Sequence, residues 1–196
     1  VVVPCDADEM RRLMYASLDW PYPLYIRLAK GGDPIVSKSE LGFEIGKGIQ
    51  LKTPGDVLFV TNGITAQRAI EAAEILCDER IDCGVFHMHT IKPFDHNGLF
   101  QASESAKLVV TIEEHVLTGG LSSAVLETLE SAMPRGAVVK SIGVPDQFIE
   151  HGKRTELWAN LRIDVHGITN QILEAFPDLG GASMSHHILT DIPCPT

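Results

Sequence analysis

The sequence predicts an α/β fold with three layers, in which a mostly parallel sheet carries helices on both of its faces. Short apolar runs alternate along the chain with longer stretches of helical periodicity, which is the order expected of βαβ units. The runs are apolar at nearly every position, as in strands that are buried on both faces. This pattern predicts strands at residues 57–61, 81–87, 108–112 and 137–142.

Helices are expected between and after these strands. Apolar residues three and four positions apart indicate helices whose apolar side faces the sheet. The pattern predicts helices over residues 66–77, 95–106, 121–132, 156–161 and 164–176, with Asp95 as the cap of the second. A weak alternation over residues 43–51 predicts an edge strand or a hairpin.

The first 40 residues differ from this regular pattern. Residues 1–3 predict the end of a buried strand, Asp6 is an expected helix N-cap with Glu9 in capping-box position, and residues 24–28 predict a second strand. A strand–helix–strand unit of this size cannot form an independent sheet. We therefore expect it to be the remnant of a preceding domain, cut at the first residue. The alternative is a natural N-terminal arm that packs on the next domain.

Three regions follow from this interpretation. Residues 1–40 are the end of the earlier domain with a linker, and Gly31-Gly32-Asp33-Pro34 supplies the turn chemistry of that linker. Residues 41–180 are the α/β domain. Residues 181–196 show no periodicity and are expected to form an extended tail.

Charge and cysteine usage limit the function classes. The 196 residues carry 16 Lys and Arg against 26 Asp and Glu, a net charge of −10, which disfavours nucleic acid and anionic membranes as partners. No apolar run approaches the ~20 residues of a membrane helix, and the sequence does not open with a secretory signal pattern. The 4 cysteines form no C-x-x-C pair, which excludes a zinc ribbon or thioredoxin motif. Because 4 cysteines in 196 residues do not suggest a disulfide scaffold, we expect reduced thiols and a cytoplasmic location.

The first candidate site follows the third predicted strand. Glu113, Glu114 and His115 lie at its carboxyl end, where open α/β sheets bind ligands, and Gly119 and Gly120 then open a helix. The free N–H groups of that helix start could hold an anion, and a carboxylate–His pair could transfer protons. The alternative, which we favour, is that Glu113 or Glu114 satisfies these N–H groups or pairs across a subunit interface.

Two further positions carry chemistry-bearing side chains. His87 and His89 point to one face of a strand end and could ligate a metal, but no nearby carboxylate or Cys offers a third ligand. We therefore expect a structural pair and assign no metal site. Arg27 is the one charged residue in the predicted strand 24–28 and could bind a phosphate or carboxylate, although a structural ion pair is equally compatible.

Several segments together resemble the transketolase family of thiamine diphosphate enzymes. The end of the family's pyrimidine-binding domain is similar to PCDADEMRRLM and PLYIRLAKG. Its C-terminal domain is similar to GDVLFVTNGITAQRAIEAAEIL, IKPFD, VVTIEEHVLTGGLSSAVLETL and GVPDQFIEHGKRTELWANLRID. The resemblance covers residues 4–176, in order, and is closest to transketolase C-terminal subunits and 1-deoxyxylulose-5-phosphate synthase. One departure is Ser122, where many relatives have Gly.

This resemblance implies a two-carbon ketol transferase whose three-domain subunits work as a dimer, with thiamine diphosphate and Mg²⁺ bound between domains of two subunits. The family's Gly-Asp-Gly metal motif has no counterpart in Gly32-Asp33-Pro34 or Gly55-Asp56-Val57, and its catalytic Glu belongs upstream of this sequence. The resemblance therefore implies no catalytic residue and no bound cofactor in this chain alone. Arg27 matches the position that binds the substrate's phosphate or terminal group.

The expected role of residues 41–180 is thus to supply scaffold and dimer contacts, and the expected partner is the missing part of the enzyme or a second copy. A naturally split enzyme, the C-terminal part of a 2-oxo-acid dehydrogenase beta subunit and a non-enzymatic interaction module stay open as alternatives. A small nucleotide-binding protein is disfavoured because Gly46-Lys47-Gly48 lacks the third Gly and the strand–helix context of a dinucleotide fingerprint.

Overall fold

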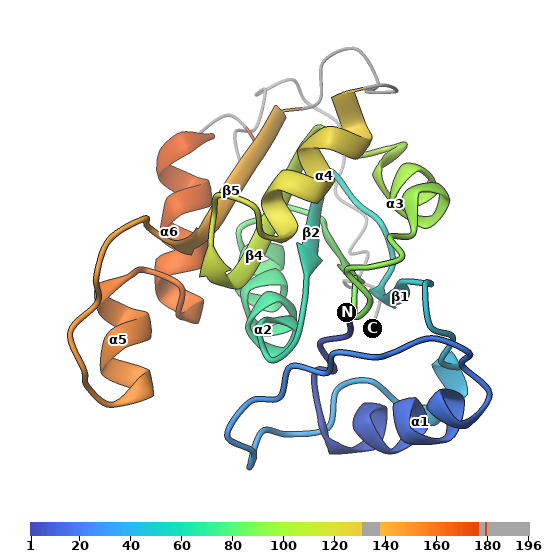
Figure 1. Cartoon of the computed structure of the whole chain (residues 1–196). Helices are drawn as coiled ribbons and strands as arrows, with labels where there is room; N and C mark the ends of the chain where they lie inside the picture. Colours follow the sequence, from blue (N-terminus) through green and yellow to red (C-terminus); the bar gives the residue numbers. More distant parts are fainter. Residues whose placement is uncertain (131–137, 177–178, 180–196) are drawn as a thin grey trace.

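A single five-stranded sheet forms the centre of the computed structural model, which describes residues 1–130, 138–176 and 179 (Figure 1). The strand order is β1-β3-β2-β4-β5, and only β1 runs antiparallel to its neighbour. The strands are β1 (Ile49–Lys52), β2 (Val57–Thr61), β3 (Cys83–His87), β4 (Leu108–Val116) and β5 (Val138–Val144). This arrangement confirms the mostly parallel sheet.

The centre of the sheet is β2, which pairs in unbroken register with β3 on one side and β4 on the other. Every residue of β2 is buried. This explains why its sequence, VLFVT, is apolar almost throughout: a central parallel strand has no face toward water.

Helices cover both faces of the sheet, as the three-layer prediction requires (Figure 1). On one face lie α2 (Thr65–Asp78) and α6 (Val165–Ala175), with α5 (Arg154–Asn160) beside them; Phe59, Leu76 and Ile168 are fully buried there. On the other face lie α3 (His96–Ser103) and α4 (Leu121–Glu130), where Leu58 packs with Leu99 and Leu129.

The N-terminal segment forms a third, smaller apolar cluster. Here α1 (Ala7–Leu18) buries Leu13 against Val2 and Ile45. Neither of the strands predicted on either side of α1 forms a full strand. Instead, Val2 makes two isolated β-bridges, a parallel one with Ile26 and an antiparallel one with Thr90. Pro4 has no N–H group and cannot extend this ladder. The short 3₁₀ helix η1 (Ser39–Leu41) follows.

Aspartates cap three of the helices. The side chains of Asp6, Asp95 and Asp164 accept hydrogen bonds from the backbone N–H groups of Glu9, Gly98 and Gly167, respectively. The first two caps were predicted from sequence. Each carboxylate also complements the positive end of its helix dipole.

Several element ends differ from the predictions. The largest differences are in β1, which begins only at Ile49 within the predicted range 43–51, and in β4. Strand β4 continues to Val116 because β5 follows it past an irregularity in register and pairs Val144 with Val116. Glu113, Glu114 and His115 therefore lie within this strand rather than after it. The predicted end of the helix over residues 121–132, the predicted start of the strand at residue 137 and the tail at residues 181–196 lie outside the described residues.

Two general properties bear on the predictions from composition. In the described ranges, no helix has the length and apolar character needed to cross a membrane. Cys5 and Cys83 are buried free thiols, as expected of reduced cysteines.

Two leucines of α4 test the assignment of its buried face. Leu129 is 1% exposed and Leu126 is 47% exposed. We expect Leu129→Ala to lower the free energy of unfolding by roughly 2–5 kcal/mol, because it leaves a cavity against the sheet. The same substitution at Leu126 changes helix propensity equally and should cost no more than about 0.5 kcal/mol. Urea unfolding of both variants measures the difference, and equal losses would contradict the assignment.

Candidate functional site

The predicted site residues gather at the carboxyl edge of the parallel strands. Arg27 reaches this edge from the N-terminal segment, and its Nη2 donates a hydrogen bond to the backbone oxygen of Glu114 at 3.0 Å. A hollow of about 30 Å³ beside them is also lined by Asn62 and Gly63, which follow β2. Arg27 therefore lies where ligands enter sheets of this kind, although it makes no ion pair in the described residues.

Glu113 is fully buried and closes the N-terminus of α4. Its two carboxylate oxygens accept hydrogen bonds from the backbone N–H groups of Leu121 at 2.7 Å and Ser122 at 2.9 Å. Burial raises the pKa of Glu113 above its ordinary value, and the two N–H groups oppose that rise. The helix start considered as an anion site thus already holds an anionic group of this chain.

Gly120 is required for this approach. A Cβ atom at Gly120 would lie 2.1 Å from Oε2 of Glu113 and 2.8 Å from the backbone oxygen of Val116, so the carboxylate would have to leave its position. Gly119 adopts a positive φ of 75°, and its N–H group donates to Ser123. The two glycines therefore serve the turn that brings the carboxylate to α4.

Glu114 points to the opposite face of the sheet and joins a different group. Its Oε1 accepts a hydrogen bond from Nε1 of Trp158 in α5 at 2.7 Å. Two guanidinium groups lie against the indole ring, with Cζ of Arg68 3.1 Å and Cζ of Arg154 4.6 Å from the ring centroid. Arg154 in turn pairs with Asp33 in the linker at 2.8 Å. This chain of contacts fixes the linker and α5 to the strand that carries Glu114.

His115, the last member of the predicted group, is exposed, and its ring bonds the neighbouring backbone oxygen of Val116. The Glu–Glu–His sequence therefore does not form one catalytic group: its first member caps a helix, its second holds a tryptophan, and its third faces solvent.

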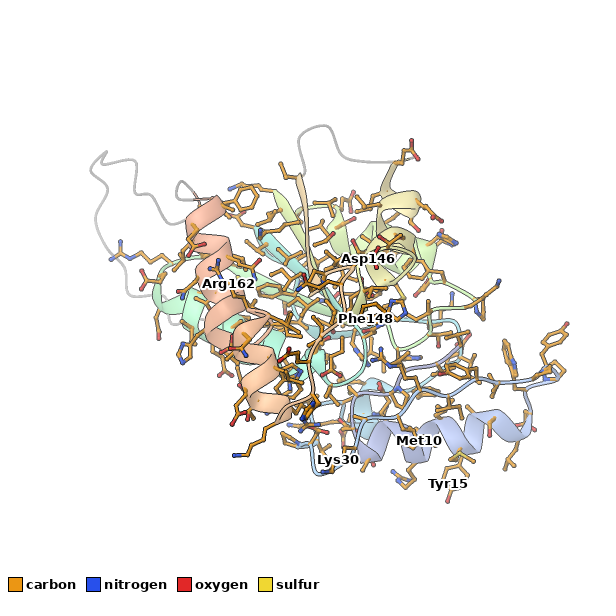
Figure 2. The ribbon with its side chains drawn as sticks, turned by 60° about the vertical axis from the view of Figure 1, so that its left-hand side comes forward. Met10, Tyr15, Lys30, Asp146, Phe148 and Arg162 are labelled. Atoms are coloured by element: carbon orange, nitrogen blue, oxygen red, sulfur yellow. The ribbon has the colours of Figure 1, made fainter. Side chains whose placement is uncertain are left out.

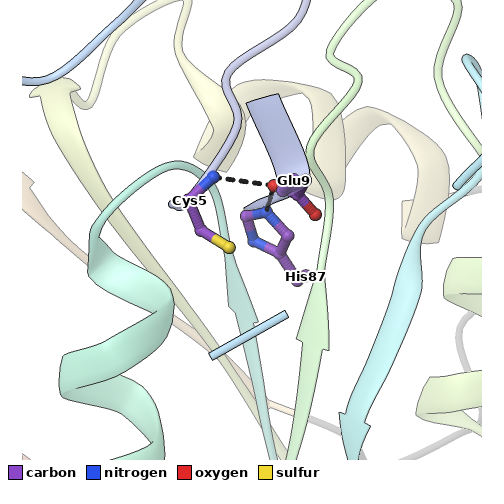
Figure 3. A group of neighbouring side chains, drawn as sticks. All are labelled: Cys5, Glu9 and His87. Carbon is purple, nitrogen blue, oxygen red and sulfur yellow. Dashed lines mark hydrogen bonds and ion pairs between the residues drawn. The ribbon is translucent and has the colours of Figure 1, made fainter. Parts of the chain in front are cut away.

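The structure gives His87 partners that the sequence did not reveal. Nε2 of His87 lies 3.0 Å from Oε2 of Glu9, and both side chains are fully buried (Figure 3). Glu9 also accepts the backbone N–H of Cys5 at 2.7 Å, and the Cys5 side chain lies against the pair. The expectation that no carboxylate or Cys lies near His87 is therefore wrong: both come from the N-terminal segment, 78 residues earlier for Glu9.

Electrostatics favour an ionised Glu9. Burial by itself would raise the pKa of Glu9, but the charge and hydrogen bond of His87 hold that pKa well below its usual range. The other histidine of the pair, His89, stacks on Phe43, and burial lowers its pKa to about 4. Its Nε2 has no hydrogen-bond partner within the described residues.

Comparison with known proteins identifies the family. Residues 46–168 match the model of the transketolase C-terminal domain. One subunit of the apulose-4-phosphate transketolase of Phocaeicola vulgatus is 34% identical over 89% of this chain and 55% of its own length. 1-Deoxy-D-xylulose-5-phosphate synthase 1 of Geobacter sulfurreducens is 35% identical over 93% of this chain and 29% of its own length. This chain thus spans about half or less of these relatives.

Solved structures of transketolases are also similar to this chain. A split gene transketolase, an inactive beta4 tetramer, superimposes with a TM-score of 0.82 and 34% identity, over 90% of this chain and 57% of its own. Transketolase from Campylobacter jejuni has the same fold, with a TM-score of 0.62 at 16% identity over 88% of this chain and 26% of its own.

The buried carboxylate of Glu113 gives a second test. In Glu113→Gln the amide nitrogen cannot accept a hydrogen bond, so the N–H of Leu121 or Ser122 loses its partner. We expect the free energy of unfolding to fall by roughly 1–3 kcal/mol. Glu127→Gln on the exposed side of α4 is the control and should stay within about 0.5 kcal/mol of the unsubstituted protein. Equal unfolding midpoints for the two variants would contradict the capping role.

The motifs, the three-layer sheet and the comparisons therefore lead to one conclusion: this chain belongs to the transketolase family and carries its C-terminal domain.

Proposed function

We propose that this chain is the C-terminal part of a thiamine diphosphate-dependent enzyme that transfers two-carbon ketol units. In this proposal residues 1–40 complete the pyrimidine-binding domain, residues 41–180 form the C-terminal domain, and residues 181–196 are a tail. The observation that carries the proposal is the similarity to a split gene transketolase over 90% of the chain, at 34% identity. The C-terminal domain would supply scaffold and subunit contacts rather than catalytic groups.

The surface of the N-terminal segment supports a missing partner. Tyr15, Leu18, Tyr22 and Tyr25 are between 65% and 79% exposed, which is unusual for so many large apolar and aromatic side chains in one short stretch. Tyr15 points from α1 away from the sheet (Figure 2). We infer that this surface packs against the remaining part of the enzyme, supplied by the same chain, by a partner subunit or by a second copy.

Four of the described helices have N-termini that are closed to a diphosphate, whereas α2 and α5 carry no side-chain cap. Such a group binds well at helix N-termini, but the N-termini of α1, α3, α4 and α6 already hold Asp6, Asp95, Glu113 and Asp164. These helix ends therefore do not fit the diphosphate of the cofactor. We infer that thiamine diphosphate and Mg²⁺ bind in the remaining part of the enzyme, where the cofactor supplies the carbanion chemistry.

Arg27 is the one substrate contact that we assign to this chain. Its guanidinium is partly exposed at the carboxyl edge of the sheet and is anchored through a backbone oxygen, which leaves its charge available. A guanidinium suits the bidentate binding of a phosphate. Glu114, held by Trp158, provides the backbone oxygen that orients the Arg27 guanidinium.

We also propose a cytoplasmic location, supported by the free thiols of Cys5 and Cys83.

Calorimetry tests whether the cofactor binds in the remaining part of the enzyme rather than in this chain. Titration of thiamine diphosphate with Mg²⁺ into this chain alone should release no binding heat. The same titration into the complete enzyme, assembled with its remaining part, should show saturable binding and accompany ketol transfer. Micromolar binding to the isolated chain would contradict the proposal.

Kinetics of the complete enzyme test Arg27. We expect Arg27→Ala to raise the KM for a phosphorylated sugar by roughly 10–100-fold, the effect of losing a charge-assisted hydrogen bond. The KM for the corresponding unphosphorylated sugar should change little. Lys107→Ala is the control, because Lys107 precedes β4 at the opposite edge of the sheet, where its exposed side chain pairs with Asp56. An equal effect on both sugars would place Arg27 outside the phosphate site.

A further inference from the structure

A buried group with metal-ligand chemistry joins the N-terminal segment to the end of β3. Sγ of Cys5, a carboxylate oxygen of Glu9 and a ring nitrogen of His87 all lie within 4.8 Å of one another (Figure 3). The residues are 2%, 0% and 0% exposed. We propose that these three side chains bind one Zn²⁺ ion.

The donor set selects the metal. Thiolate and imidazole are ligands of Zn²⁺ and related transition metals, whereas Mg²⁺ and Ca²⁺ prefer oxygen alone. One thiolate and one carboxylate neutralise a divalent cation, and the nearby carboxylate oxygen of Asp6, 3.5 Å from Sγ, is held by two backbone N–H groups. A neutral assembly is what a fully buried position requires.

The three ligand atoms need to approach one another only slightly to bind a zinc ion. Ligand atoms of a tetrahedral zinc ion lie about 3–4 Å apart, given Zn–S bonds of about 2.3 Å and Zn–N bonds of about 2.0 Å. Nε2 of His87 and Oε2 of Glu9 are already 3.0 Å apart. Only the Cys5 side chain has to move inward, by about 1 Å, to complete three ligands.

The neighbours of the ligands already have the arrangement of a second coordination shell. Nδ1 of His87 lies 3.3 Å from the hydroxyl of Thr61, and Oε1 of Glu9 accepts the hydroxyl proton of Ser37 at 3.1 Å. Metal-bound histidines typically donate their other N–H group to such an oxygen, which fixes the ring orientation. The two atoms that would bind the metal, Nε2 of His87 and Oε2 of Glu9, face each other, and Oε2 also accepts the backbone N–H of Cys5.

An entry route and a fourth ligand come from a hollow beside Cys5. This hollow has a volume of about 170 Å³ and is bounded by Pro4, Cys5, Gly31 and Gly32. A water from it can complete the coordination. Asp6 is less suited to do so, because its Oδ2 already accepts the N–H groups of Val36 and Ser37.

Binding changes protons but not oxidation states. The Cys5 thiol releases its proton to solvent, and the Sγ–Zn bond forms. His87 releases to solvent the proton that Nε2 carries in its bond to Glu9, and Nδ1 keeps its own proton and donates it to Thr61. The ion therefore replaces the His87–Glu9 hydrogen bond with a bond to each partner.

Cobalt provides the direct test. Titration of Co²⁺ into the protein should give the absorption of a tetrahedral ion together with a thiolate-to-cobalt charge-transfer band, saturating at one ion per chain. Zn²⁺ should displace it and raise the thermal unfolding midpoint. Cys5→Ser should abolish the charge-transfer band and weaken Zn²⁺ binding by at least ~10-fold, whereas Thr61→Val should weaken it by roughly 10–100-fold while keeping the band.

Cys83→Ser is the matched control, since Cys83 is the other buried free thiol and bonds only the backbone oxygen of Ile81 in the described residues. It should bind cobalt like the unsubstituted protein. Circular dichroism confirms that each variant is folded, and His87→Gln supplies a second ligand variant if Cys5→Ser is not. The proposal is overturned if the unsubstituted protein shows no thiolate band, or if the band survives in both ligand variants.

Discussion

The attachment of the N-terminal segment to the sheet depends on one buried carboxylate, that of Glu9. It receives hydrogen bonds from three separated parts of the chain: the backbone of Cys5, the hydroxyl of Ser37 and the ring of His87. A buried ionised group is stable only when it is fully paired, so these three parts must come together for any of them to fit. The position of α1, the linker and the end of β3 follow from this requirement.

A second carboxylate applies the same principle within the α/β domain. Glu113 on β4 satisfies the first N–H groups of α4, and the missing side chain at Gly120 makes the approach possible. The adjacent Glu114 faces the other way, because side chains alternate along a strand, and it fixes Trp158. Two neighbouring residues of one strand thus anchor a helix on each face of the sheet.

The sequence was sufficient for the elements whose signals are local. The bounds of β2 agree with the predicted strand at 57–61, since five consecutive residues with no polar face could only be a buried strand. The caps at Asp6 and Asp95 were also predictable, because a cap and its N–H partner lie three residues apart. The strands beside α1 were overpredicted: valine favours a strand, but the neighbouring chain meets Val2 at single bridges only.

The contacts between distant segments could not be predicted from one sequence. The Glu9–His87 pair spans 78 residues and the Trp158–Glu114 bond spans 44, and no periodicity connects such positions. Glu9 did carry a local signal as a capping-box residue, but its side chain bonds Cys5, one residue before the cap, and continues to β3. Local sequence rules therefore identify the helix start at which Glu9 lies, whereas the tertiary fold determines which distant groups its side chain contacts.

The surroundings of Trp158 have a consequence for experiments on this protein. Its indole contacts the guanidinium groups of Arg68 and Arg154 and donates a hydrogen bond to Glu114. Arg154 links it to Asp33 in the linker. The only other tryptophan, Trp20, lies in the N-terminal segment beside Tyr22. Replacing Trp20 with phenylalanine would leave a single tryptophan, whose emission on selective excitation reports, without any added label, whether the linker is docked on α5.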